Sequence, residues 1–238
     1  MKTVEYLFPE FSNLYADSKN IEYLSKCNKK IKVVYTHASD EPIFVRKKVD
    51  MIYMGSMPDE KVPGAIQLLS VYKERIKELI EDGVIFLITG NSLEVFGSYI
   101  KEGNKRLDGL GIFDYYVVKD MENKHASWFL GEYNNIYIVG HRNQFSKVYD
   151  IKNRFIKMKG GYGIDLEGAN EGICYKNFYA TFLLGPLLIL NPVFTKYLLK
   201  KLDLDDGLFE EMIIMNAYER RISHFRKKDA RFDIGQYG

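Results

Sequence analysis

The residues best suited to chemistry lie in the stretch FLITGNSLEVFGSY, at positions 86–99. An apolar run ends at Thr89, and Gly90, Asn91 and Ser92 follow where a helical pattern begins. A buried strand that turns through a glycine into a helix is the geometry that exposes a nucleophile, with backbone N–H groups available to stabilise an oxyanion. The pattern is weak alone, because many doubly wound proteins have a glycine at a strand end. A role for Thr89 therefore depends on the elements that position it.

Short apolar runs alternate with helical patterns over the N-terminal part of the chain. Strands are predicted at Thr3–Phe8, Ile31–Tyr35, Met51–Met54 and Val84–Thr89, and helices at Ser18–Lys29, Val62–Glu81 and Ser92–Glu102. Strands that alternate with helices in this way indicate a parallel, doubly wound sheet. In such a sheet, functional groups gather at the carboxyl ends of the strands. The turn at Thr89 lies at one of these ends.

The pattern changes after Gly103, where short runs separated by turn residues predict antiparallel strands and hairpins. Further on, Asn191-Pro192 suits a helix start, with Asn as the cap and Pro at the first position. A last amphipathic helix is predicted from Asp205 to Lys228, with Leu208, Met212, Met215, Ile222 and Phe225 at helical spacing. We find no linker that requires a domain boundary, so we expect one domain over residues 1–238.

Charge and cysteine content exclude several classes of function. The chain has 34 Lys and Arg against 32 Asp and Glu, a net charge of +2 that gives no reason to expect nucleic acid as a partner. Its two cysteines, Cys27 and Cys174, are in no metal-ligand spacing and are expected to pack in the interior. No segment has the character of a signal peptide or a membrane span. We expect a cytoplasmic protein without metal or cofactor.

Four further stretches carry a resemblance to a known family. SNLYADSKNIEYL, LDGLGIFDYY, GYGIDLEGANEGICYKN and YATFLLGPLLILNPVFTKYLL occur in this order and extend from Asn13 to about Leu199. Together with the turn at Thr89 they resemble the class I glutamine amidotransferases of the cobyric-acid-synthase-like branch. Within that branch the resemblance is strongest to the glutaminase subunit of the bacterial lipid II isoglutaminyl synthase.

The motifs of this family are met at most positions. L-Y-x-D-x-x-N-I is met by Leu14, Tyr15, Asp17, Asn20 and Ile21, and L-x-G-L-G-I-x-D by Leu107, Gly109, Leu110, Gly111, Ile112 and Asp114. G-Y-G, E-G and Y-x-N are met by Gly161, Tyr162, Gly163, Glu171, Gly172, Tyr175 and Asn177. The resemblance implies a flavodoxin-like α/β fold, with a mostly parallel sheet flanked by helices and with additional antiparallel strands.

The activity that the resemblance implies is hydrolysis of glutamine and transfer of ammonia to a Mur-ligase-like partner in peptidoglycan synthesis. The chemistry needs a cysteine nucleophile in I-C-G-G-x-Q-x-L-G and a histidine base in T-Y-L-H-G-P. This chain has Thr89 at the cysteine position and Leu184 at the histidine position. Both reacting groups are therefore missing.

The resemblance also suggests which residues border a ligand. We expect a pocket at the turn lined by Gly55, Ser56, Thr89, Gly90 and Asn91. Asp59 matches the acidic residue of the family's G-G-G-S-D loop, which borders the glutamine site, although Ser56 and Met57 replace two of its glycines.

Other polar residues near these motifs are expected to have ordinary roles. Glu94, early in the predicted helix, is expected to interact favourably with the helix dipole. In VGHRNQ, which lies where the family has G-F-E-N-H, Asn143 is retained and Gln144 takes the histidine position. We expect a surface turn for this segment that contains His141, with a polar pocket wall as the alternative.

Three functions remain open. The first, which we favour, is an amidotransferase-like pseudoenzyme of bacterial cell-wall metabolism that acts as a binding or regulatory subunit beside an amidating ligase and holds a small amide or amino-acid ligand. The second is an active amidotransferase or hydrolase with a non-standard nucleophile or a relocated site. The third is a scaffold protein in which Met57, Leu93 and Leu184 fill the space above Thr89 and the C-terminal helix is the contact surface.

Overall fold

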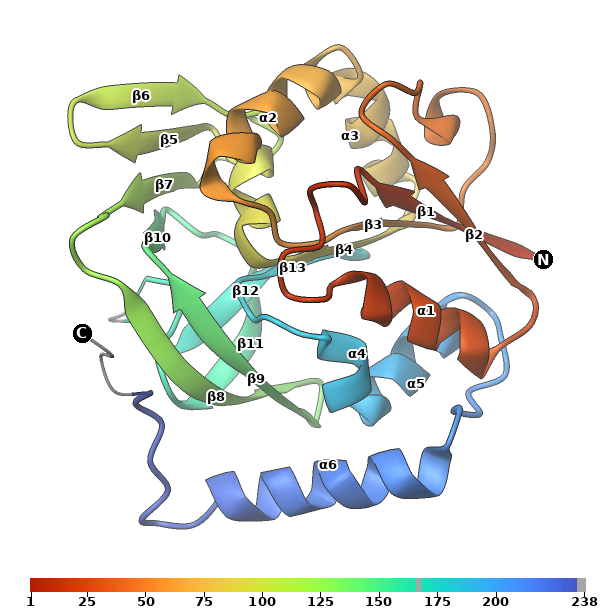
Figure 1. Ribbon diagram of the computed structural model, residues 1–238, viewed down its shortest axis with the longest axis vertical. Helices are drawn as coiled ribbons and strands as arrows, with labels where there is room; N and C mark the ends of the chain where they lie inside the picture. The colour runs from red at the N-terminus through yellow and green to blue at the C-terminus, as the bar shows by residue number, and fades with distance from the viewer. Residues whose placement is uncertain (166–167, 235–238) are drawn as a thin grey trace.

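The computed structural model describes residues 1–165 and 168–234. Leu166 and Glu167, within the GYGIDLEGANEGICYKN stretch, lie outside the described residues, as do residues 235–238. The centre of the molecule is a nine-stranded sheet (Figure 1). In spatial order its strands are β2 (Ile31–Thr36), β1 (Lys2–Leu7), β3 (Met51–Met54), β4 (Ile85–Thr89), β13 (Phe178–Thr181), β12 (Asn170–Tyr175), β11 (Arg154–Gly160), β8 (His125–Tyr133) and β9 (Ile136–Gln144).

The first five strands of this order pair in parallel. Counted along the parallel sheet alone, their order is 2-1-3-4-5, which is the flavodoxin-like arrangement. The remaining four strands pair antiparallel and extend the sheet on one side. The predicted fold class, a mostly parallel sheet with additional antiparallel strands, is therefore confirmed.

Helices cover both faces of the parallel strands. They are α1 (Ser18–Cys27), α4 (Leu187–Leu190) and α5 (Pro192–Lys201) on one face, and α2 (Val62–Ser70) and α3 (Lys73–Glu81) on the other (Figure 1). Side chains of the central strands alternate between two cores, so that Phe86 and Ile88 of β4 face one and Ile85 and Leu87 face the other. Both faces are apolar because both are buried, which is why these strands read as continuous apolar runs.

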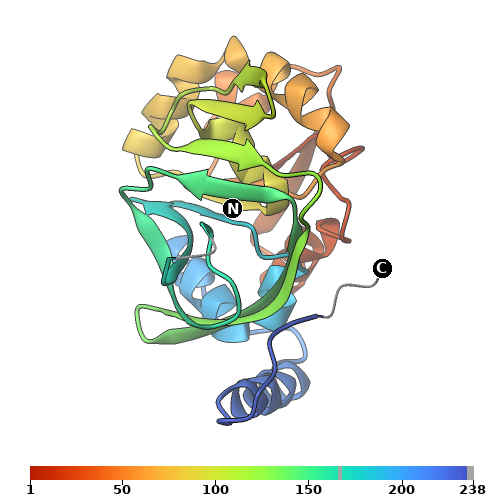
Figure 2. The same cartoon turned by 90° about the vertical axis from the view of Figure 1, so that its left-hand side faces the viewer.

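A second sheet lies beside the main one. In spatial order it contains β10 (Ser146–Tyr149), β7 (Tyr116–Lys119), β5 (Tyr99–Glu102) and β6 (Lys105–Asp108). Figure 2 shows it next to the antiparallel part of the main sheet. Because β10 follows β9 directly and β5 follows the turn after β4, this small sheet is attached to the carboxyl end of the parallel strands.

The prediction of a helix over Ser92–Glu102 is wrong. The chain forms a 3-10 helix, η3 (Gly90–Phe96), and then strand β5. Backbone amides of the LDGLGIFD stretch explain the early end, since Leu110 N donates to Val95 O and Ile112 N to Phe96 O. These tertiary hydrogen bonds take the carbonyl groups that a longer helix would use.

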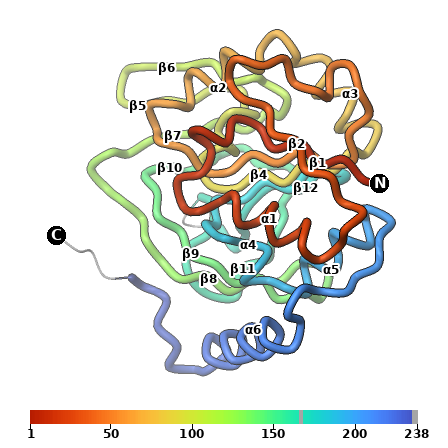
Figure 3. The backbone as a smooth tube through the Cα atoms, turned by 45° about the vertical axis from the view of Figure 1, so that its right-hand side comes forward, coloured from red at the N-terminus to blue at the C-terminus, as the bar shows by residue number. Residues whose placement is uncertain are grey.

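Two other predicted helices are also modified. The helix over Val62–Glu81 divides into α2 and α3, with Val71 and Tyr72 between them. The last helix, α6, is shorter than predicted, at Glu211–Phe225. It lies below α4 and α5 in Figure 1, as the tube in Figure 3 also shows, and packs against β8 and β9 through the buried side chains of Tyr218 and Ile222.

The remaining helical elements are short connections. Two short 3-10 helices, η1 (Ile43–Val45) and η2 (Asp59–Lys61), connect β2 to β3 and β3 to α2. Asn191-Pro192 starts α5 as predicted. Within residues 1–165 and 168–234, no helix is both long and apolar enough to span a membrane.

Candidate functional site

Thr89 lies at the carboxyl end of β4, but its side chain does not face solvent. The residue is fully buried, and its hydroxyl donates a hydrogen bond to Asp17 Oδ1 at 2.9 Å. The hydroxyl of Tyr53 lies 3.1 Å from Thr89 Oγ1 and 3.3 Å from the same carboxylate oxygen. Thr89 is thus part of a buried polar cluster beneath the turn.

Asp17 is the centre of this cluster. Besides the Thr89 hydroxyl, it accepts a hydrogen bond from Tyr15 N at 3.1 Å and one from the backbone of Ser56. Burial raises the pKa of Asp17, and the hydrogen bonds from Thr89 and the backbone oppose that rise. Gly55 allows the close approach, because a Cβ there would lie 2.3 Å from Ser12 O and 2.4 Å from Asp17 Cβ.

Asn20 connects the cluster to the segment before α5. Its amide nitrogen donates to the Tyr53 hydroxyl at 2.8 Å, and its Oδ1 accepts from Leu188 N at 2.8 Å. The Asp and Asn of the LYADSKNI stretch therefore connect the start of α1 to β3, β4 and α4 around the turn. Their presence is explained by architecture, without any contact to a ligand.

A small cavity of about 80 Å³ lies next to this turn. Its walls come from the loops after β1, β3 and β4 and from the end of β9 and start of β10; they are Leu14, Tyr15, Ser56, Met57, Asp59, Gly90, Asn91, Glu94, Lys124, Asn143, Gln144, Phe145, Ser146 and Leu184. Pockets that enclose drug-sized ligands usually measure roughly 300–1,000 Å³, so only a compact group fits here.

The cavity contains four of the six predicted pocket residues, Ser56, Asp59, Gly90 and Asn91. The expectation for Thr89 and Gly55 needs correction, because neither lines it. The reason for Thr89 is its hydrogen bond to Asp17, which directs the hydroxyl beneath the turn. Met57 and Leu184 do reach the cavity, yet they leave space unfilled, so the scaffold interpretation does not follow from their bulk.

Ser56 lies directly over Gly90. A Cβ at Gly90 would be 1.9 Å from Ser56 Oγ, and Gly90 has φ +63°, so only glycine fits this position. Ser56 Oγ is buried and has no hydrogen-bond partner among the described residues. An unpaired buried hydroxyl is costly, and this one belongs to a residue that lines the cavity.

Asn91 binds the backbone of the neighbouring loop. Its Oδ1 accepts from Met57 N at 2.9 Å, and its Nδ2 donates to Met57 O at 2.8 Å. The resemblance places a glycine at this position, which would leave Met57 N without that partner. The side chain of Asn91 therefore accepts the hydrogen of Met57 N, a backbone donor next to the position of the family's nucleophile.

Leu184 contacts β9 through its backbone. Leu184 N donates to His141 O at 2.9 Å, in a β-bridge between the two residues. The surface turn expected around His141 is wrong, since this segment is part of strand β9 and pairs with β8. Of the chain's four histidines, none lines the cavity, so within the described residues no imidazole is available as a base there.

Glu94 has a different role from the one expected. It is fully buried at the cavity, where its Oε2 lies 3.0 Å from Lys119 Nζ. Lys119 Nζ also donates to Asp59 Oδ1 at 2.5 Å. Because η3 and β7 approach each other only in the tertiary structure, the sequence gives no signal for this pairing beyond a charge within the apolar run Leu93 to Phe96.

Glu94, Asp59 and Lys119 form a group with two carboxylates and one ammonium. Burial by itself would lower the pKa of Lys119, but Glu94 and Asp59 together raise it, so the ammonium stays protonated. Burial raises the pKa of Glu94, and Lys119 only partly opposes the rise, because Glu94 shares that cation with Asp59.

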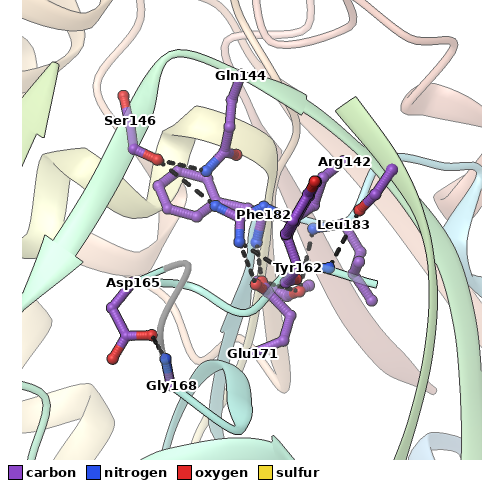
Figure 4. A network of polar contacts seen from close by, with 11 residues as sticks. Arg142, Gln144, Ser146, Tyr162, Asp165, Gly168, Glu171, Phe182 and Leu183 are labelled. Carbon is purple, nitrogen blue, oxygen red and sulfur yellow. Dashed lines mark hydrogen bonds and ion pairs between the residues drawn. The ribbon is translucent and has the colours of Figure 1, made fainter. Parts of the chain in front are cut away.

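Ser146 joins Glu94 to a second buried ion pair, between Arg142 and Glu171. Its hydroxyl donates to Glu94 Oε1 at 2.6 Å. Its backbone oxygen accepts from Arg142 Nη2 at 3.5 Å, and Figure 4 shows Ser146, Arg142 and Glu171 together. Arg142 Nη1 lies 3.5 Å from Glu171 Oε2, and both side chains are fully buried. Glu171 Oε1 accepts from Thr181 Oγ1 and Phe182 N, so the motif glutamate fastens β12 to the segment before Leu184.

Neither cysteine is among the residues that line the cavity. Cys27 ends α1 and is half-buried, and Cys174 lies in β12 with its sulfur 3.7 Å from the Tyr133 hydroxyl. Burial raises the pKa of both thiols, which disfavours the reactive thiolate. In the part of the chain that the structure describes, no three His, Cys, Asp or Glu side chains are grouped as a metal site would need.

Comparisons with known proteins place this geometry in a family. The chain is 31% identical over 221 residues to the lipid II isoglutaminyl synthase (glutamine-hydrolyzing) subunit GatD of Staphylococcus aureus, with 91% of each chain covered. It is 25% identical over 204 residues to the subunit of the same name from Streptococcus pneumoniae, covering 79% of this chain and 75% of that one. No protein-family model matches the sequence.

A solved structure supports the same fold. A glutamine amidotransferase from Thermotoga maritima aligns with a TM-score of 0.52 at 10% identity, covering 93% of this chain and 92% of that one. At this identity the likeness concerns the fold alone, and it agrees with the flavodoxin-like strand order. The extent and identity of the match to the staphylococcal subunit go further: the chain belongs to the glutamine amidotransferase-like family that contains the GatD subunits of lipid II isoglutaminyl synthase.

Proposed function

We propose that this protein is a family member that does not hydrolyse glutamine and acts as a binding or regulatory subunit beside an amidating ligase. One observation carries the proposal: the hydroxyl at the nucleophile position is buried and donates to Asp17, while the base position holds Leu184. A threonine hydroxyl is un-ionised at neutral pH and needs a base within hydrogen-bond reach. The leucine side chain cannot accept that proton.

The second support concerns the oxyanion. Acyl transfer from a carboxamide develops negative charge on the amide oxygen, which is stabilised by N–H donors aimed at that position. Asn91 Oδ1 accepts the hydrogen of Met57 N, so that donor is already paired. The nucleophile, the base and one oxyanion donor are thus all missing around this cavity. This supports a site that binds a ligand without hydrolysing it.

The partner is carried over from the relatives. Their name describes a subunit of a synthase that hydrolyses glutamine, and a synthase that attaches ammonia needs a ligase component. We propose a Mur-ligase-like or other amidating partner for this chain, in bacterial peptidoglycan metabolism and in the cytoplasm. The ligand of the elbow cavity, the space of about 80 Å³ beside the turn, would be a small amide or amino acid. We further propose that residues 1–238 fold as one domain.

An active enzyme remains the second candidate, and one contact favours it. Thr89 Oγ1 already donates to the Asp17 carboxylate. In an active enzyme, Asp17 would be the general base that removes the hydroxyl proton. The two groups differ widely in proton affinity, since a carboxylate is a far weaker base than an alkoxide. The hydroxyl would also need to rotate out of the cluster to reach a substrate in the cavity.

Ammonia release from glutamine separates the two candidates. The purified protein is assayed alone and with its partner ligase, beside a Thr89→Ala variant. We expect no release above the buffer in any sample, and no covalent adduct after incubation with the glutamine analogue diazo-oxo-norleucine. Ammonia release that disappears in Thr89→Ala, or an adduct on any residue, would overturn the proposed loss of hydrolysis.

A further inference from the structure

The elbow cavity presents more acceptors than donors. The amide nitrogens of Asn143, Gln144 and Asn91 donate to Tyr15 Oη, Ser146 O and Met57 O, within the protein's own hydrogen-bond network. Glu94 contributes a fully buried carboxylate to the wall, and Asp59 a carboxylate that is 45% exposed. A ligand that supplies N–H donors therefore suits this lining better than one that supplies further oxygen acceptors.

The formal charges point in the same direction. Two carboxylates, Glu94 and Asp59, share one buried ammonium, Lys119, whose side chain is only 6% exposed. With both carboxylates ionised, the trio has one negative charge in excess. Because burial raises the pKa of Glu94, a bound cation would favour its ionised form. Lys124 also lines the cavity, with its ammonium over the Phe145 ring. Lys124 and Asp59 are both exposed, so water screens both charges, whereas Glu94 is fully buried and its charge is not screened in this way. A bound anion would add repulsion where the dielectric constant is low, and a bound cation would complete the balance.

Ser56 supplies an independent observation. The residue lines the cavity, and its hydroxyl oxygen is buried without a hydrogen-bond partner among the described residues. An unpaired buried hydroxyl usually indicates a missing water or ligand. Ser56 and Glu94 come from different loops, yet both are part of the same cavity wall.

We propose that the elbow cavity binds a small primary ammonium group, recognised by Glu94, Asp59 and the free hydroxyl of Ser56, with Lys119 as a built-in counter-ion. This deepens the proposed function and rests on it, because it treats the cavity as a binding site without turnover. It narrows the ligand from a small amide or amino acid to a molecule with a primary ammonium group. The site thereby differs from one that recognises a neutral carboxamide for hydrolysis.

Three matched probes test the charge preference: ethylammonium, acetamide and acetate. Binding to the full-length protein is followed by the amide resonances of Ser56, Gly90 and Ser146 in two-dimensional NMR titrations. We expect ethylammonium to shift these resonances, acetamide to bind at least about tenfold more weakly, and acetate not to bind. Equal or tighter binding of acetamide or acetate, or no shift with any probe, would overturn the proposal.

Variants then test the recognising groups. Glu94→Gln is expected to lower ethylammonium affinity by about tenfold, whereas Lys119→Met is expected to raise it, because the two carboxylates lose their internal cation. Asp59→Asn, at a partly exposed position, replaces Lys119→Met if that variant does not fold, and is expected to weaken binding. The matched control is Glu81→Gln, since Glu81 pairs with Lys176 at the surface.

The outcomes separate this inference from the proposed function. Unchanged affinity in both Glu94→Gln and Asp59→Asn contradicts the ammonium site, whatever the ammonia assay shows. Ammonia release from glutamine contradicts the proposed loss of hydrolysis, whatever the ethylammonium titration shows.

Discussion

Thr89 Oγ1 and Asp17 Oδ1 lie 2.9 Å apart, joined by a hydrogen bond in which the hydroxyl at the end of β4 donates to a carboxylate from the start of α1. Asp17 is one of the motif positions shared with glutaminases, and Thr89 is the position where those enzymes need a cysteine. The contact makes the Thr89 hydroxyl part of the internal hydrogen-bond network, which supports the proposed loss of hydrolysis. Each of the following predictions depends on a contact at or near this turn.

Restoring the missing groups should restore hydrolysis. The variant Thr89→Cys/Leu184→His/Asn91→Gly supplies the nucleophile and the base, and it frees Met57 N as an oxyanion donor. We expect it to release ammonia from glutamine. Omitting Asn91→Gly should lower the rate by roughly 10²–10³, the usual effect of one oxyanion donor, and omitting Leu184→His by roughly 10²–10⁴. The variant with Thr89→Ala in place of Thr89→Cys is the control, and activity in that control would contradict the scheme.

Gly90 should tolerate no side chain. In Gly90→Ala the added Cβ meets Ser56 Oγ at 1.9 Å with φ at +63°. We expect a loss of about 2–4 kcal/mol in the free energy of unfolding, from backbone strain plus overpacking. Gly103→Ala is a matched control, because Gly103 has φ +55° but nothing within 4 Å of the new Cβ, and it should lose only about 1 kcal/mol.

The measurement is urea unfolding followed by circular dichroism. Adding Ser56→Gly to Gly90→Ala should recover part of the loss, since it removes the closest contact. Equal destabilisation by Gly90→Ala and Gly103→Ala would show that the Ser56 contact does not restrict the turn.

The buried pair of Arg142 and Glu171 should be costly to break from one side. Arg142→Met leaves the Glu171 carboxylate without its cation in a fully buried position, and we expect a loss of about 3–5 kcal/mol in the free energy of unfolding. The double variant Arg142→Met/Glu171→Gln should recover at least half of it, because a neutral amide oxygen still accepts from Thr181 and Phe182. Urea unfolding of the two variants measures the difference, and an equal loss in both would contradict the role assigned to the pair.

Asp17 should make stability depend on pH in a defined direction. Burial raises its pKa in the folded state, so its contribution to the free energy of unfolding is full below the unfolded value of about 4 and declines as pH rises through the folded pKa. We therefore expect the stability of the wild type, relative to Asp17→Asn, to decrease with rising pH. Thr89→Val should enlarge the total decrease and extend it to higher pH, because it removes a hydrogen bond that lowers this pKa.

Urea unfolding at a series of pH values above about 4 checks this prediction. A difference between wild type and Asp17→Asn that grows with pH would mean that the folded state lowers the pKa of Asp17, so that hydrogen bonding would outweigh burial at this carboxylate.

The parallel half of the fold is already readable in the amino-acid sequence. Strands β3 and β4 are buried along their whole length because helices cover both faces, and that burial is visible as apolar runs such as Met51–Met54, whose predicted and observed bounds agree. The turn after β4 was also readable, since Gly90 follows Thr89 directly and adopts the left-handed conformation that a glycine there suggests. Motif positions were enough to identify Thr89 and Leu184 as substitutions.

What those substitutions and their neighbours do depends on tertiary contacts. Residues 92–102 form part of η3 and strand β5, where the sequence predicts a helix. The reason is that hydrogen bonds from the later LDGLGIFD stretch outweigh the local preference for a helix. The sequence predicts an interaction of Glu94 with the helix dipole, yet Lys119 of β7 pairs with this carboxylate in the interior. The direction of the Thr89 hydroxyl was likewise set by Asp17, which is 72 residues away in the chain. Such long-range contacts leave no periodic pattern in the sequence, and their energies appear only when the chain is folded.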